Sequence, residues 1–100
     1  MDTILTKNDN GILVKITGRF STDEAAPFLK ETGPLMEEKN IKVIMDLSEM
    51  EYIASAGIRC FVMLLKACKA NGSSLLLKDL TPQVKDIFTL TSLLDKFDVE

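Results

Sequence analysis

The chain has 100 residues, of which 12 are basic and 15 acidic, so its formal net charge is −3. This length predicts one domain, and without a basic excess the chain is not expected to bind nucleic acid or an anionic membrane. Histidine is absent, which excludes catalytic triads and zinc sites that need an imidazole. Two cysteines are too few for a disulfide framework.

The first twenty residues predict a β-hairpin. Residues 3–8 and residues 12–17 are both expected to be strands, the second being mostly β-branched and apolar. Between them, Asp9-Asn10-Gly11 contains the Asn-Gly pair that favours a tight turn. Gly18 is expected to end the second strand.

A helix is expected to begin after Ser21. Ser21 and Glu24 have the spacing of a capping box, and the apolar residues that follow recur roughly at helical period. Gly33-Pro34 should kink or split this helix, which is expected to close by Asn40.

The rest of the chain predicts strands that alternate with helices. Residues 42–47 form an apolar run typical of a strand covered on both faces, and residues 74–77 form another buried strand. A loop is expected at 48–54, and an apolar helix at 55–71 that Asn71-Gly72 ends. Thr81 and Pro82 begin a third helix as cap and first residue, and a short strand at 97–99 follows a further turn. The predicted fold class is therefore α/β, with a mixed sheet of four or five strands, a leading hairpin and packed helices.

Ser55 is the residue at which chemistry is most expected. It begins a helix at the C-terminal end of a parallel strand, where open α/β sheets usually carry function. The free N–H groups and the dipole of a helix start would favour a phosphate on Ser55, and Arg59 lies four residues on, on the same helix face. The alternative is that Ser55 only caps the helix, which by spacing alone is the commoner role.

Several segments together resemble one family. Asp46-Leu47-Ser48 and Tyr52-Ile53-Ala54-Ser55-Ala56-Gly57-Ile58 match the strand end and the helix start of STAS domains (sulphate transporter and anti-sigma-factor antagonist). Weaker matches, such as Gly18-Arg19-Phe20 before the first helix, extend the resemblance over nearly the whole chain. The chain resembles the small stand-alone anti-sigma-factor antagonists of bacteria, and a STAS domain is expected over residues 1–100.

The resemblance implies a partner-switching cycle. In that family an anti-sigma-factor serine kinase phosphorylates the serine at the position of Ser55. The unphosphorylated protein would bind the kinase and free a sigma factor, the phosphorylated protein would be released, and a serine phosphatase would reset the switch. The partner-binding residues are expected to be Phe20, Ser21, Asp23, Met50, Tyr52, Ala54, Ser55, Ala56, Gly57 and Arg59. The chain departs from the family pattern at Ala54 and Ser21, where many members carry aspartate.

Other functions remain as alternatives. A protein with the same fold would instead be a docking subunit of a larger assembly, an ABC-type lipid transport system or a stress-signalling complex, with Ser55 unphosphorylated. An enzyme with Ser55 as nucleophile is disfavoured because no histidine can activate it. Asp46, Glu49 and Glu51 are expected to be solvated charges rather than a cation site. No nucleotide-binding glycine loop is found, so an ATP site is not supported. Neither a metal nor a cofactor is expected.

The remaining candidates have structural interpretations. Cys60 and Cys68 lie in apolar company within a helix, where packing is expected. Met50 and Tyr52 fit contacts with a partner and anchoring of the loop about equally well. No signal peptide and no apolar run of about 18 residues is found, so a cytoplasmic location is expected.

Overall fold

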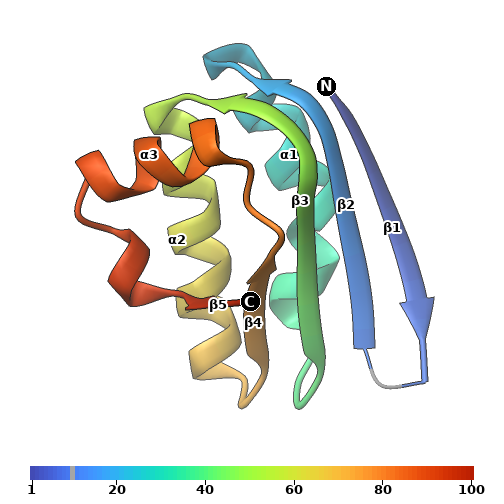
Figure 1. Cartoon of the computed structure of the whole chain (residues 1–100). Coiled ribbons are helices and arrows are strands. Elements are labelled where there is room, and N and C mark those ends of the chain that lie inside the picture. The colour runs from blue at the N-terminus through green and yellow to red at the C-terminus, as the bar shows by residue number, and fades with distance from the viewer. Residues whose placement is uncertain (10) are drawn as a thin grey trace.

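The computed structural model of the protein describes residues 1–9 and 11–100. Its strands form one mixed sheet in the order β1-β2-β3-β4-β5, in which β1 and β2 are antiparallel and the other neighbours are parallel (Figure 1). The strands are β1 (Asp2–Asn8), β2 (Gly11–Phe20), β3 (Lys42–Ile53), β4 (Ser74–Lys78) and β5 (Asp98–Val99). The predicted mixed sheet with a leading hairpin is confirmed. Asn10, in the middle of the expected tight turn, lies outside the described residues.

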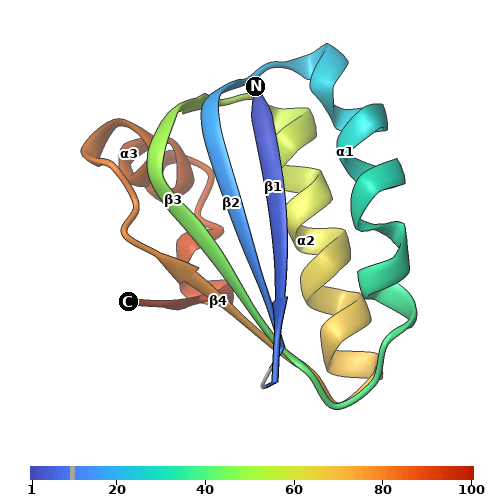
Figure 2. The same ribbon diagram turned by 90° about the vertical axis from the view of Figure 1, so that its right-hand side faces the viewer.

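Two helices cover one face of this sheet. Figure 2 shows α1 and α2 side by side on one side of the strands, and α3 beside the end of β3 that precedes α2. The α-helices are α1 (Ala25–Thr32), α2 (Ser55–Ala70) and α3 (Pro82–Leu90), and the 3-10 helices are η1 (Thr22–Glu24), η2 (Gly33–Glu37) and η3 (Leu94–Lys96). As predicted, the first helical segment is split at Gly33-Pro34, where α1 gives way to η2.

The opposite face of the sheet is only partly covered. In β3 the side chains of Val43, Met45 and Leu47 are buried, whereas Ile44 and Asp46 between them are half-exposed. The expectation that this strand is covered on both faces is therefore wrong, because both long helices pack on the same side.

The core is built around all five phenylalanines of the chain. Phe61 of α2 lies at its centre, with ring centroids 5.9 to 6.1 Å from those of Phe20, Phe28 and Phe88. Phe97, near the chain end, contacts Phe88 at 5.7 Å. These contacts join β2, α1, α2 and α3 into a single core.

Of the two helix caps predicted from the sequence, one is present in the structure and the other is not. Thr81 caps α3 as predicted, since its Oγ1 accepts a hydrogen bond from the Val84 N–H at 3.4 Å. The predicted capping box is wrong: Ser21 makes no side-chain capping bond. The Glu24 carboxylate instead forms an ion pair with the amino group of Met1, at 3.5 Å.

Candidate functional site

Ser55 is the first residue of α2 and is exposed to solvent. The residue in the cap position is Ala54, whose backbone is extended and whose N–H donates to the carbonyl of Phe20 at 2.8 Å. The alternative interpretation, in which Ser55 only caps the helix, is therefore wrong. Within the part of the chain that the structure describes, no hydrogen bond to the Ser55 hydroxyl is found, so this hydroxyl is available for modification.

The surroundings of Ser55 favour a negative charge. Helix α2 is 16 residues long and has no acidic residue in its first turn, so its N-terminal dipole is not neutralised from within the helix. Arg59 lies one turn on, exposed, and on the same helix face as Ser55. A phosphate on Ser55 would thus gain from the backbone N–H groups and from a guanidinium.

Gly57 brings the start of α2 close to β2 and β3. A methyl group at Gly57 would lie 2.8 Å from Ile53 Cγ1 and 2.8 Å from Phe20 Cδ1, closer than real side chains approach. Both neighbours are buried, so the glycine serves packing. It holds the exposed Ser55 at a fixed place at the sheet edge.

The segment before Ser55 is a strand and not the expected loop. Strand β3 continues through residues 48–53 and pairs with β2 as far as Phe20 and Ile53, with register shifts next to Lys15 and Gly18. Gly18, at φ +97°, thus accompanies an irregularity in β2 rather than ending it. On the other side of β3, the Thr81 hydroxyl donates to the carbonyl of Met50 at 2.9 Å.

The structure separates the predicted partner-binding residues by exposure. Ser55, Asp23 and Arg59 are exposed, and Ser21, Tyr52 and Ala56 are half-buried. The four that are buried are Phe20, Met50, Ala54 and Gly57. The first two of these have no exposed surface at all, so their side chains belong to the core and cannot contact a partner. Met50 therefore anchors the strand, one of the two roles considered for it.

Sequence reasoning missed Arg19 as a candidate. Its guanidinium carbon lies 4.5 Å from the centre of the Tyr52 ring, a cation–π contact between β2 and β3 at the edge that carries Ser55. Arg19 and Arg59 are the only arginines of the chain. The small number of arginines is visible in the sequence, but the pairing of Arg19 with Tyr52 depends on the register shifts between β2 and β3.

The three acidic residues of the segment are held separately. Asp46 Oδ1 accepts the N–H of Ser48 at 3.0 Å, and Glu49 lies 3.4 Å from Lys15 Nζ. Glu51 is exposed. Burial alone would raise the pKa of Asp46, but the hydrogen bonds from Ser48 and the nearby lysines outweigh it and hold the pKa below its usual value. Among the described residues, no cluster of three or more metal-binding side chains is found.

Asp46→Asn is expected to weaken the fold at neutral pH by about 0.5 kcal/mol and much less in acid. The lowered pKa means that ionised Asp46 favours the folded state above pH 4, roughly, and that this stability is lost as the pH falls through the folded-state pKa. Urea unfolding of both proteins at neutral and acidic pH measures the effect. Asp86→Asn, at an exposed site on α3, is the control. An equal loss at both pH values would contradict the prediction.

The two cysteines face the interior of the helical layer. Both are buried, and burial raises the pKa of each thiol. Cys60 Sγ lies 3.9 Å from the carbonyl of Ala25 in α1. Their predicted packing role agrees with these contacts.

Comparison with known proteins agrees with this geometry. Residues 3–100 match the STAS domain family. The anti-sigma-B factor antagonist of Bacillus subtilis is 31% identical over 93 residues, which cover 93% of this chain and 84% of that protein. The unphosphorylated form of the anti-sigma factor antagonist SpoIIAA superimposes with a TM-score of 0.83 at 11% identity, covering 99% of this chain and 88% of that one. The phosphorylated form of Bacillus SpoIIAA gives 0.76 at 10% identity, covering 99% and 91%.

The family predicted from the strand-end and helix-start motifs is thereby confirmed. The match covers nearly the whole chain, and the sheet with its helices is the fold of anti-sigma factor antagonists. Of the helices in the described ranges, none has the length and apolar character needed to span a bilayer. The chain belongs to the STAS domain family.

Proposed function

We propose that this protein is an anti-sigma-factor antagonist that binds an anti-sigma-factor serine kinase and is released when that kinase phosphorylates Ser55. The proposed cycle takes place in the cytoplasm, where a serine phosphatase removes the phosphate. The kinase carries out the chemistry, and this chain is its substrate and binding partner. No cofactor is needed on this chain.

The exposed hydroxyl of Ser55 at the start of α2 carries the proposal. Because the cap is Ala54, phosphorylation would not remove a capping bond, and the helix would remain formed. A phosphate adds about −1.5 to −2 charge at neutral pH. That charge would lie one helical turn from the exposed Arg59, at the end of β3 that carries Tyr52, where it would change the fit of a partner more than the fold.

The Arg19–Tyr52 pair is expected to anchor the partner. An arginine stacked on a tyrosine offers a large, rigid contact area at little entropic cost, and both residue types are enriched among binding hot spots. Arg19→Ala should therefore weaken partner binding by about 1–2 kcal/mol. Titration calorimetry with the kinase from the same cell tests this.

Lys69→Ala is the matched control for Arg19→Ala. Lys69 is exposed in the last turn of α2, about 20 Å along the helix from Ser55. Its removal also deletes one positive charge but should leave the affinity unchanged. Equal losses in the two variants would show an effect of net charge and not a specific contact.

Incubation with the kinase and ATP, followed by measurement of intact mass, tests the proposed function directly. Wild type should gain one phosphate and Ser55→Ala none. A phosphate that persists in Ser55→Ala would place the switch elsewhere. Kinase binding without phosphorylation, or capture of transporter or stress-complex subunits from the native cell, would instead support the docking-subunit alternative.

A further inference from the structure

Strand β1 leaves one edge of the sheet open. It is the first strand in the sheet order and pairs only with β2 among the described strands. Its pairing with β2 is regular from Asp2 to Asn8, without a register shift, and the strand contains no proline. Short strands, bulges, prolines and charged side chains, lysine above all, are common means of preventing edge pairing. Strand β1 has no bulge and no proline, and its one lysine, Lys7, forms an ion pair with Glu38 of the same chain at 3.0 Å. Its outer backbone groups can therefore accept another strand.

Two adjacent apolar side chains lie on this edge. Ile4 is 58% exposed and Leu5 is 37% exposed. Leu5 is opposite Val14 and so points to the helix-covered face, whereas Ile4 is opposite Lys15 on the open face. A strand added to β1 would therefore cover apolar surface on both faces at once.

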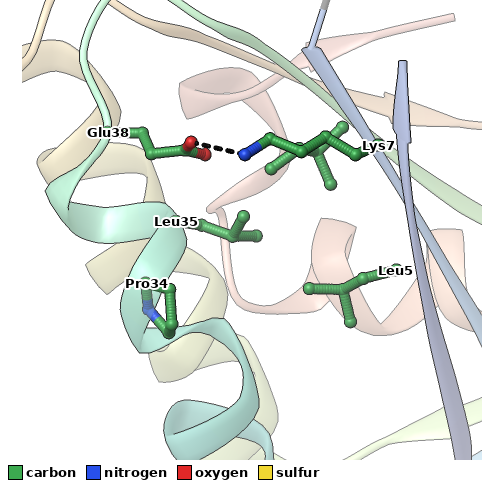
Figure 3. Close-up of a pocket in the computed structure, with 6 residues that line it drawn as sticks. Leu5, Lys7, Pro34, Leu35 and Glu38 are labelled. Carbon is green, nitrogen blue, oxygen red and sulfur yellow. Dashed lines mark hydrogen bonds and ion pairs between the residues drawn. The ribbon is translucent and has the colours of Figure 1, made fainter.

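An apolar pocket lies beside Leu5. It has a volume of about 250 Å³ between β1 and η2. Figure 3 shows Leu5 pointing toward Leu35 and Pro34, with the ion pair between Lys7 and Glu38 (3.0 Å) along one side. The pocket extends the apolar surface from the strand to the helical layer, next to the open edge.

We propose that β1 pairs antiparallel with β1 of a second copy of this chain, with Leu5 opposite Leu5. This register pairs all seven residues of the strand, since Leu5 is the middle residue of Asp2–Asn8. It places Lys7 opposite Thr3 and Asp2 opposite Asn8, so neither charge of the strand faces a like charge. The two pockets and the two Leu5 side chains then form one continuous apolar surface.

The symmetry of this pairing keeps the Ser55 surfaces free. A two-fold axis perpendicular to the sheet runs midway between the two Leu5 residues and joins the two sheets into one, with the helices of both copies on the same side. Because the paired strands run in opposite directions, the two Ser55 edges lie at opposite ends of the joined sheet. The dimer would present two separate partner surfaces, and the inference does not depend on the proposed function.

Sedimentation equilibrium of the wild-type chain, followed to about 0.5 mM, tests the dimer. A mass that rises toward twice the 11.1 kDa of one chain is expected. Ile4→Lys places a charge on the paired edge and should weaken association at least about tenfold. Leu90→Lys makes the same change at a residue of α3 that is 85% exposed, and should dimerise like wild type. A wild-type mass that stays at one chain, or equal effects of the two variants, would overturn the proposal.

Cross-linking tests the register even where a lysine at position 4 disturbs the strand. Leu5→Cys should be joined efficiently by a short bis-maleimide, because the two thiols face each other across the axis. Cys60 and Cys68 are 2% and 4% exposed and should not react. Leu90→Cys is the control and should give only collisional cross-links. Equal yields from Leu5→Cys and Leu90→Cys would exclude the proposed pairing.

Discussion

Ser55→Ala and Ser55→Asp are expected to have similar folds and opposite binding to the kinase. Ser55 makes no capping bond, so the alanine variant should retain wild-type stability within about 0.5 kcal/mol. The aspartate variant should be as stable or slightly more so, since a carboxylate in the first turn interacts favourably with the helix dipole. Yet its charge at the partner surface should weaken binding by about 1–3 kcal/mol, roughly five- to 160-fold.

Thermal unfolding and titration calorimetry on the same samples separate the effect on stability from the effect on binding. Ser74→Asp supplies the control, because it adds the same charge at an exposed residue that begins β4, at the opposite end of the parallel strands from Ser55. It should bind like wild type. If Ser55→Asp binds as tightly as Ser55→Ala, the charge at this position does not control the partner.

Gly57→Ala is expected to destabilise the fold by about 1–3 kcal/mol. In an exposed helix the same change would stabilise by up to about 1 kcal/mol, because glycine is a poor helix former. Here the added methyl would approach Ile53 and Phe20 to 2.8 Å, and both are fixed in the core. The collision should therefore outweigh the gain in helix propensity. Urea unfolding of both proteins measures whether the free energy of unfolding falls, as expected, or rises.

A double-mutant cycle with Phe20→Leu tests the cause. Phe20→Leu alone should destabilise the fold. Its smaller side chain should nevertheless make room for the methyl group at position 57, so the double variant should be more stable than the sum of the two single effects predicts. Strict additivity would mean that the loss in Gly57→Ala does not come from contact with Phe20. An increase in stability for Gly57→Ala would contradict the packing argument altogether.

The elements that the sequence predicts well are those whose signals are local. The apolar face of α2, its end at Asn71-Gly72 and the Thr81-Pro82 start of α3 are set by residues close in the chain. The position of Ser55 at the helix start followed from the same kind of pattern. These signals depend on backbone geometry over one or two turns, which neighbouring residues determine.

The features that the sequence did not predict depend on long-range pairing. Strand β3 passes through two register shifts against β2, which breaks the alternation that marks a strand and made residues 48–54 look like a loop. The same shifts bring Arg19 over Tyr52. The burial of Phe20 and Met50 likewise depends on which side the helices cover, and no local spacing reveals this.

The strand character of residues 48–53 determines how a phosphate at Ser55 can act. This segment pairs with β2 on one side, and on the other side the carbonyl of Met50 accepts a hydrogen bond from Thr81. Its backbone therefore has little conformational entropy left to lose when a partner docks. A switch that works by melting and reordering a flexible segment would have to break this pairing first. Under the proposed function, control of binding at this edge would therefore come from charge and shape on a preorganised surface, and amide hydrogen exchange in the segment should be slow with or without the phosphate.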